Sequence, residues 1–443
     1  MNYLSSIFFA LLLTIGIGYF ILNVKKLIRN IKLGQDINRT DNKTERWKNM
    51  ALIALGQSKM VKRPFSGFLH IIVYIGFVII NIEVIEIIID GLFGTHRFLS
   101  ILGPFYDVLI ASFEILASLV LLAVIAFWIR RNISKIKRLN SSDLVGKPKN
   151  DANYILYFEI VLMSLFLLMN AADLHLQNIE GGFGHYSKVG SYPVSQFLTP
   201  IFNGMSTTSV FLFERTTWWL HIIGILIFLN YLYFSKHLHI LLAFPNTFFA
   251  DLNAKGKLNN LESVTNEVKL MMDPNVDPFA NPANPEAIPA KFGASDVQDL
   301  NWVQLLNAYS CTECGRCTSS CPANLTGKKL SPRKIMMDTR DRLEEVGRNI
   351  DLNKGKFIDD GKSLLNDYIT PEELWACTSC NACVEECPIN ISPLSIIIDM
   401  RRYLVMEQSA APTELNNVMT NIENNGAPWQ YNQMDRLNWA NES

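Results

Sequence analysis

Long apolar runs fill the first half of the chain, whereas the second half is polar. A helix needs about 20 apolar residues to cross a bilayer, and five runs reach or approach this length. They are Leu4–Val24, Ser66–Asp90, Phe105–Ile129, Tyr154–Ala172 and Thr217–Ser235. The pattern predicts an all-α membrane bundle of five helices over residues 1–241, followed by a mainly α-helical domain outside the bilayer.

Composition divides the polar half into three parts. Five prolines between residues 274 and 289, mixed with Asn and Asp, predict an extended linker over 242–300. Residues 301–412 contain all eight cysteines and form the predicted soluble domain. Residues 413–443 contain a turn beside Trp429 and a second tryptophan, Trp439. We expect this tail to dock onto another protein.

Two cysteine strings in the soluble domain share the spacing C-x2-C-x2-C-x3-C-P. Bacterial-type ferredoxins use this run to bind cubane iron–sulfur clusters, and the fourth cysteine of each run binds the other cluster. By that rule, the ligands of one [4Fe-4S] cluster are Cys311, Cys314, Cys317 and Cys387. The ligands of the second are Cys377, Cys380, Cys383 and Cys321.

Structural zinc sites are the alternative, because C-x2-C is also a zinc spacing. Zinc sites use two separated pairs of ligands, whereas here three thiols fall within seven residues in each string. Each string is followed by Ser-Pro, at Ser331-Pro332 and Ser392-Pro393. Ser is a good N-cap and Pro suits the first helical position, so the repeat predicts two cluster loops that are each backed by a helix.

Lys and Arg are unevenly distributed among the loops between the apolar runs. Loops 25–65 and 130–152 contain eleven and seven, whereas loops 91–104 and 173–214 contain one each. The positive-inside rule then predicts a bacterial inner-membrane protein with its N-terminus outside and its cysteine domain in the cytoplasm, where thiols stay reduced. The net charge of −1 gives no indication of a nucleic-acid partner.

All the histidines lie in the first 240 residues. If the fifth helix continues to His239, then His221 and His239 lie five turns apart on one face. His70, near the start of the second helix, is expected at the depth of His239, and two imidazoles at one depth predict the axial ligands of a haem b. The alternative is that both are ordinary interfacial histidines. A second haem at His221 would need His175 or His96 as its other ligand.

Three carboxylates on the second helix, Glu83, Glu86 and Asp90, lie on one narrow stripe roughly opposite His70. Quinone chemistry moves protons together with electrons, and ionisable groups inside a membrane are usually functional. Glu83 and Glu86 are therefore candidate proton relays. The alternative is that Glu86 and Asp90 mark a helix end in water.

Residues 1–240 resemble the five-helix haem b subunit of respiratory nitrate reductase and its relative in membrane-bound heterodisulfide reductase. The resemblance rests on the five spans, on His70 and on the spacing of His221 and His239. That family usually has a further histidine at the place of Ile80. Residues 300–443 look like the dicluster ferredoxin part of heterodisulfide-reductase-type proteins.

These features predict a membrane-anchored electron-transfer subunit of a respiratory oxidoreductase. It would pass electrons between quinone, haem b, two [4Fe-4S] clusters and a separate cytoplasmic cysteine-rich or flavin subunit, which would carry part of the catalytic site. One alternative is a subunit of an electron-transfer-flavoprotein or hydroxy-acid:quinone oxidoreductase. An alternative from another class is a non-catalytic iron–sulfur sensor or membrane anchor, which would need no haem.

Overall fold

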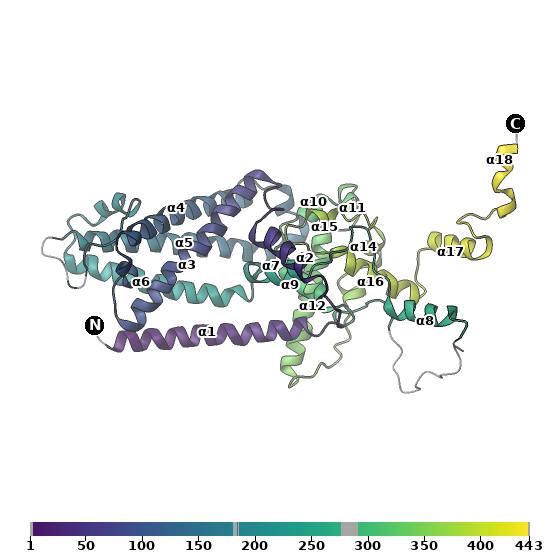
Figure 1. Ribbon diagram of the computed structural model, residues 1–443, viewed down its shortest axis with the longest axis horizontal. Coiled ribbons are helices and arrows are strands. Elements are labelled where there is room, and N and C mark those ends of the chain that lie inside the picture. The colour runs from purple at the N-terminus through teal and green to yellow at the C-terminus, as the bar shows by residue number, and fades with distance from the viewer. Residues whose placement is uncertain (1–2, 180–183, 185, 276–290, 442–443) are drawn as a thin grey trace.

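A computed structural model describes residues 3–179, 184, 186–275 and 291–441 (Figure 1). Regular secondary structure in this part of the chain is helical, apart from two isolated β-bridges. The helices that are long and apolar enough to span a membrane are α1 (Tyr3–Ile31), α3 (Pro64–Phe93), α4 (Pro104–Asn132), α5 (Lys147–Gln177) and α6 (Thr207–Leu232). The predicted fold class, a five-helix apolar bundle followed by a helical domain, is confirmed.

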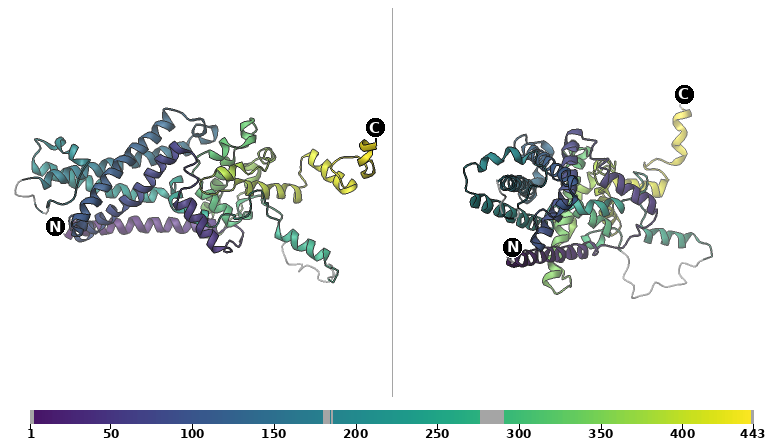
Figure 2. Two further views of the ribbon diagram at one scale, coloured as in Figure 1. Left: turned by 45° about the horizontal axis from the view of Figure 1, so that its top comes forward. Right: turned by 60° about the vertical axis from the view of Figure 1, so that its left-hand side comes forward.

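Consecutive long helices are neighbours in the bundle: α3 packs on α4, α4 on α5, and α5 on α6. Helix α1 packs on both α3 and α6 along one side (Figures 1 and 2). Buried side chains such as Phe113, Phe166 and Ile222 fill the interior. Only 11% of the most apolar window of α1 is buried, against 39% in α4, α5 and α6. Helix α1 therefore leaves most of its surface for lipid.

Shorter helices make up the rest of the described structure. They are α2 (Lys43–Met50), α7 (His239–Phe248), α8 (Glu262–Met272), α9 (Trp302–Ser310), α10 (Arg316–Ser319), α11 (Pro322–Leu325), α12 (Pro332–Leu352), α13 (Leu364–Asp367), α14 (Pro371–Trp375), α15 (Ala382–Glu386), α16 (Pro393–Met406), α17 (Thr413–Asn425) and α18 (Asn438–Asn441). Helices α12 and α16 begin at the two predicted Pro positions, and the side chains of Ser331 and Ser392 accept a backbone N–H at each start.

The fifth long helix differs from the expected span at both ends. It begins at Thr207, where the Ser206 side chain accepts the backbone N–H of Ser209 and caps the helix. Glu214 and Arg215, which interrupt the apolar run, form an ion pair at 2.5 Å within it. It ends at Leu232, and the Ser235 side chain accepts the backbone N–H of His237 and so caps a new turn. Serine favours such local bonds over continuing a helix.

His221 and His239 therefore lie on separate helices, α6 and α7. The expectation that one continuous helix places both on the same face is wrong. Lys236–Leu238 forms a 3₁₀ turn between the two helices, with Ser235 as its N-cap, so the direction of His239 is set by α7 instead of by the register of α6.

The predicted linker, 242–300, contains most of α7 and all of α8, and four of the five prolines between residues 274 and 289 lie outside the described residues. The described part of the tail, residues 413–441, contains α17 and α18 and stands away from the rest of the molecule (Figure 2). Its apolar side chains, including Trp429, Tyr431 and Trp439, are exposed. Docking of this tail onto a partner stays a prediction.

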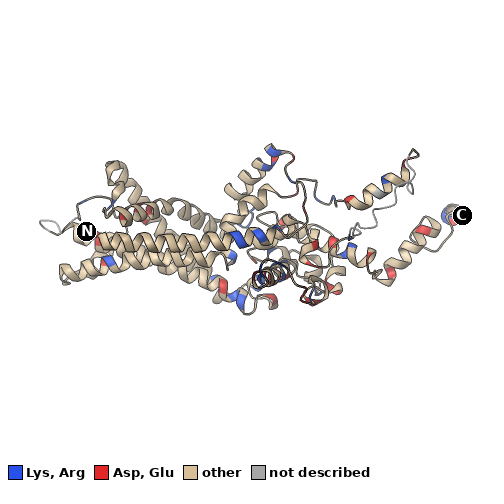
Figure 3. Ribbon diagram, turned by 90° about the horizontal axis from the view of Figure 1, so that it is seen from below, with Lys and Arg blue, Asp and Glu red and all other residues tan. Residues whose placement is uncertain are grey.

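The cysteine domain packs against one end of the bundle, which we call the proximal end. Helix α1 contacts α9 and α12 there, and Asn30 donates to the hydroxyl of Tyr309 at 3.0 Å. Leu27 and Leu232 of the bundle share one apolar core with Leu305 and Val346 of the domain. Charged residues gather around this junction, whereas the long helices carry few along most of their length (Figure 3). The opposite end of the bundle is the distal end.

Candidate functional site

The fourth cysteine of each string lies beside the other string. A cavity of about 30 Å³ is lined by Cys311, Cys314, Cys317 and Cys387 of one predicted set and by Cys383 of the other. Besides its burial, the cysteine neighbours that raise the pKa of Cys383 are Cys377, Cys321 and Cys380. The structure thus brings together the two crossed sets that the sequence predicts. All eight thiols are free, with no disulfide between them.

The two strings fold alike because their turns repeat. Glu313 and Gly315 in the first string have positive φ values of 55° and 71°, and the equivalent Ser379 and Asn381 have 54° and 60°. These left-handed residues reverse the chain between successive cysteines. Gly315 is also required by space, since a Cβ there would lie 2.5 Å from the guanidinium of Arg333.

Burial determines the chemistry of the thiols. It raises the pKa of Cys311 and of Cys383 to about 12 and that of Cys387 to about 11. Iron must therefore displace a proton from each thiol, as expected of a metal ligand. The Sγ of Cys387 accepts the backbone N–H of Ile391 at 3.3 Å. Hydrogen bonds to cluster sulfur atoms are one of the factors that set a cluster's reduction potential.

The first string is held against the bundle by arginine side chains. Arg316 is buried and donates to the carbonyls of Lys59 and Met60, which precede α3, at 3.0 and 3.3 Å. Arg138, from the loop after α4, donates to the carbonyl of Cys314 at 2.6 Å. In the second string, Cys380 is exposed. Both strings therefore contact the segment before α3, the second through ion pairs of Glu385 with Lys62 and of Glu386 with Arg63, while Cys380 of the second string reaches the surface of the domain.

His70 and His239 meet at the proximal end of the bundle, with their ring centroids 6.4 Å apart. Metal–imidazole bonds are about 2 Å long, so one metal ion ligated by two opposing imidazoles separates their centroids by roughly 6.3 Å. His70 Nδ1 is buried without a hydrogen-bond partner among the described residues. His239 Nδ1 lies 3.1 Å from the carbonyl oxygen of Lys236, which leaves Nε2 for a metal. The donor pair fits an axially ligated iron.

His237 lies close to this pair but points elsewhere. Its ring centroid is 5.6 Å from that of His239, with the ring planes nearly perpendicular, and its Nε2 lies 3.7 Å from a carboxylate oxygen of Glu159. Burial lowers the pKa of His237 to about 3 and also lowers that of His239. Both imidazoles are therefore neutral, which is the form that binds metal.

His96 and His175 are the two candidates to complete a second haem site with His221, and the contacts observed for each are with other residues. His221 is buried beside the ring of Phe166, His96 lies 3.3 Å from Asp173, and His175 packs against Phe202. None of the described ring contacts of His221 is to another histidine. A second haem stays a prediction.

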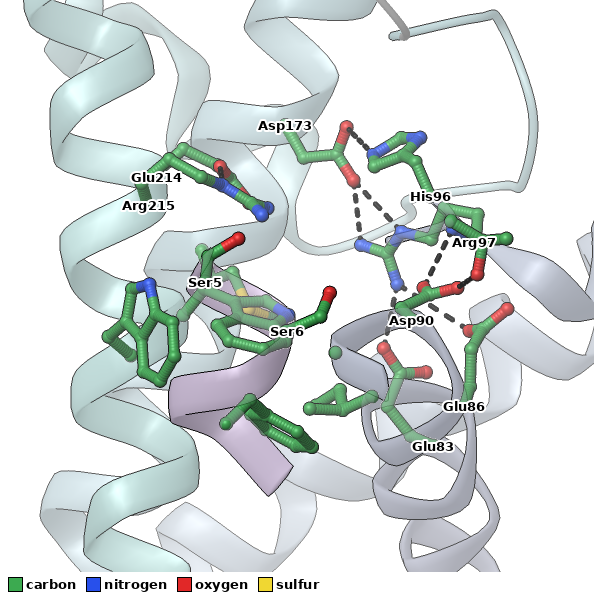
Figure 4. A pocket seen from close by; sticks show the side chains of 17 residues that line it. Ser5, Ser6, Glu83, Glu86, Asp90, His96, Arg97, Asp173, Glu214 and Arg215 are labelled. Atoms are coloured by element: carbon green, nitrogen blue, oxygen red, sulfur yellow. Dashed lines mark hydrogen bonds and ion pairs between the residues drawn. The ribbon is translucent and has the colours of Figure 1, made fainter. Parts of the chain in front are cut away.

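A polar cavity of about 110 Å³ lies at the distal end of the bundle (Figure 4). Residues from α1, α3, α5 and α6 and from the loop after α3 line it, among them Ser6, Phe9, Glu214, Trp218 and Trp219. Apolar rings therefore cover part of a space whose remaining wall is charged (Figure 4).

Arg97 is the centre of the charged wall, and it is buried. It donates to Glu83 at 2.7 Å and to Asp173 at 2.9 Å (Figure 4). It also donates to Asn170 at 2.6 Å. Sequence reasoning found Glu83 but missed Arg97 and Asp173. Arg97 could have been found, because it is the only Lys or Arg in its loop.

The three carboxylates of the acidic stripe have different roles. Asp90 accepts the backbone N–H groups of Arg97 and Phe98 and so holds the loop after α3. Glu86 accepts a backbone N–H and the hydroxyl of Tyr106 at 3.0 Å. Glu83 alone keeps a buried oxygen, Oε2, without a hydrogen-bond partner among the described residues. Of the two predicted relays, Glu83 is thus the one with an oxygen left for a ligand or proton.

Comparison with known proteins identifies the cysteine domain. Residues 310–391 match the 4Fe-4S dicluster domain. The chain is 31% identical, over 99% of its length, to a probable iron–sulfur-binding oxidoreductase, FadF, of Bacillus subtilis. It is 27% identical, over 92% of its length, to an EtfAB:quinone oxidoreductase of Syntrophomonas wolfei.

The chain covers 61% and 55% of the lengths of these two relatives. A segment covering 24% of the chain is also 34% identical to one polypeptide of a CoB–CoM heterodisulfide reductase of Methanosarcina acetivorans, and it covers 52% of that polypeptide. No solved structure matches the chain. The chain thus carries an iron–sulfur electron-transfer domain next to five helices that are long and apolar enough to span a membrane. The match of this domain confirms the iron–sulfur part of the resemblance.

Proposed function

We propose that this chain is a membrane electron-transfer subunit that connects quinone, through one haem b and two [4Fe-4S] clusters, to a separate soluble redox protein. The observation that carries the proposal is the order of the sites along the molecule. The polar cavity lies at the distal end, the pair of His70 and His239 at the proximal end, and the two cysteine sets beyond it. The exposed Cys380 then lies where a soluble partner can approach.

The crossed cysteine sets would hold the two clusters, and His70 and His239 would hold the haem. When bound, these groups supply one-electron chemistry, and the chain supplies their ligands and spacing. The hydrogen bond from His239 Nδ1 to a backbone carbonyl orients its ring. Arg316, between Cys314 and Cys317, donates to the carbonyls of Lys59 and Met60, so the first cysteine set lies against the start of α3, the helix that carries His70.

The distal cavity suits the head group of a quinone. Quinone carbonyls accept hydrogen bonds, which Arg97 and Arg215 can donate, and the flat ring suits the aromatic side of the cavity near Trp218 and Trp219. Reduction of a quinone takes up two protons, and the unpaired oxygen of Glu83 is placed to deliver one. An isoprenoid tail could leave beside α1, which is the least enclosed helix.

The soluble partner has two candidates, and the relative from Syntrophomonas wolfei favours an electron-transfer flavoprotein. Its name states that it connects EtfAB with quinone, and the likeness covers 92% of this chain. An electron-transfer flavoprotein docked near Cys380 would exchange electrons with the second cluster. A heterodisulfide-reductase-type cysteine-rich subunit is the other candidate. A non-catalytic sensor or anchor would show neither haem nor quinone-dependent reduction of the clusters.

The proposed function is tested with the purified full-length protein and menadiol, a soluble naphthoquinol. Menadiol should reduce the clusters of the wild-type protein, and Glu83→Gln should slow this reduction by about 10²-fold, because a positioned acid–base group contributes 10²–10⁴-fold. The measurement is stopped-flow bleaching of cluster absorbance. Asp107→Asn, an exposed carboxylate in the first turn of α4, is the matched control and should keep the wild-type rate. Equal rates in all three proteins would refute the role of Glu83, and no reduction in the wild type would refute the proposed function.

The proposed orientation in the membrane is tested with tags. A tag after residue 443 or within 133–146 should be protected from protease in right-side-out vesicles, whereas a tag within 186–206 should be cleaved. The reason is the excess of Lys and Arg in the loops at the proximal end, 18 against 2 in the loops at the distal end. Protection of the distal tag and cleavage of the others would reverse the orientation.

A further inference from the structure

Lys236 lies at the junction of the bundle and the cysteine domain and makes contacts there through its backbone N–H, its ammonium and its carbonyl. Its backbone N–H donates to Asp151 at 3.2 Å, and its ammonium donates to the carbonyl of Pro148 at 2.7 Å. Its ammonium also forms a close ion pair with Glu313. Its carbonyl oxygen lies 3.1 Å from Nδ1 of His239. The side chain of Lys236 is only 8% exposed, so these bonds form away from water.

Glu313 is the partner of Lys236 in the cysteine domain. It lies between Cys311 and Cys314, and its side chain is 2% exposed. Its second carboxylate oxygen pairs with Arg340 of α12 at 2.8 Å. Glu313 thus fixes the first cysteine loop to α12 on one side and to Lys236 on the other.

These contacts connect two predicted redox sites through one residue. The path runs from the first cysteine loop through the Glu313 carboxylate to the Lys236 side chain, and then from the Lys236 carbonyl to the imidazole of His239. A carbonyl that accepts the Nδ1 proton selects the tautomer of a histidine and the direction of its Nε2. The residue that orients His239 is therefore the same residue that binds the first cysteine loop.

We propose that Lys236 is a positioning residue that holds the His239 imidazole and the first cysteine loop in a fixed relation for electron transfer between them. The proposal rests on the proposed function, since it presumes a haem at His239. One electron passes between the two sites in each step, and no bond forms or breaks and no proton moves. The second string has no counterpart of this bridge, because Ser379 stands at the position of Glu313.

A buried ion pair can also serve only to join two domains, so the variants must remove charge without leaving a lone buried charge. The double variant Lys236→Met with Glu313→Gln removes both charges and keeps both side-chain lengths. The exchange variant Lys236→Arg replaces the ammonium with a guanidinium and so keeps a positive charge between Glu313 and Asp151. Lys329→Met with Glu372→Gln removes an exposed ion pair of the cysteine domain and is the matched control.

The measurements are the iron and haem content, the EPR spectra of haem and clusters, and the rate at which the haem is reduced after the clusters are reduced. In the double variant we expect full iron and haem, altered g-values of the haem, and a rate at least 10-fold below the wild type. The exchange variant should keep part of the rate, and the control should match the wild type in all measurements.

Wild-type g-values and an unchanged rate in the double variant would overturn the proposal. Loss of iron and haem from both the double and the exchange variants would overturn it too, because that is the result of a purely structural bridge. Absence of haem from the wild-type protein would overturn the haem part of the proposed function, and the present inference with it. If haem is present but its g-values and its rate of reduction do not change in these variants, the inference is overturned and the proposed function is not.

Discussion

His239→Ala is expected to abolish the low-spin haem b signal and quinone-coupled activity while leaving both clusters intact. The rings of His70 and His239 lie 6.4 Å apart and in the proposed function would together hold the haem iron, so loss of either imidazole would remove one of its two protein ligands. His70→Ala should have the same effect. The measurement is the optical and EPR spectrum of the purified protein, together with haem and iron analysis.

His237→Ala is the matched control for this prediction. His237 is a neighbouring buried histidine whose Nε2 faces Glu159, so its loss should leave the haem spectrum in place. Loss of haem in His237→Ala together with a normal spectrum in His239→Ala would show that His237 is the ligand. Normal haem in all three variants would remove the histidine pair from the proposed relay.

Cys321→Ser is expected to damage the cluster bound by the second string, and Cys387→Ser the cluster bound by the first. The reason is the crossed placement: Cys387 lines the cavity with Cys311, Cys314 and Cys317, while Cys321 lies among the cysteines of the second string. Each variant should lose about half of the roughly eight iron atoms that two cubanes hold.

The two damaged clusters should be distinguishable by EPR, because their cysteine sets differ in exposure: Cys380 is exposed, whereas Cys311 and Cys387 are buried. Cys380→Ser serves as the reference for damage to the second cluster, and Cys314→Ser for damage to the first. If the spectrum of Cys321→Ser resembled that of Cys314→Ser, the crossed ligand sets would be wrong. Iron lost completely from both variants would show that neither cluster forms without the other.

Hydropathy and cysteine spacing predicted most of the fold, because both are local properties of the sequence. The apolar runs located five helices, and each Ser-Pro pair marked the start of a helix behind a cysteine string. The start of α6 was missed because its charged residues, Glu214 and Arg215, neutralise each other inside the helix. The mean hydropathy of a window falls when it includes two charged residues, whether or not these residues pair with each other.

The candidate sites were predicted less completely, because they depend on residues far apart in the chain. The proximity of His70 and His239 was expected for a wrong reason, a continuous fifth helix that in fact ends at Leu232. The network around Arg97 joins α3 to α5 across about 75 residues, and no spacing rule connects them. The bridge at Lys236 likewise depends on a turn whose geometry the sequence pattern did not reveal.

The opposite placement of the distal cavity and the cysteine domain has an electrical consequence. Glu83 and His70 are both on α3, 13 residues or about 20 Å apart along its axis. In the proposed function, an electron that passes between a quinone in the cavity and the clusters would therefore cross much of the bilayer's field. A full crossing of a 100 mV potential is worth about 2.3 kcal/mol per charge. With the cysteine side negative, electrons that flow toward the cavity dissipate the membrane potential, and electrons that flow away from it build the potential. The soluble partner's reduction potential therefore decides whether this protein draws on the cell's energised membrane or charges it.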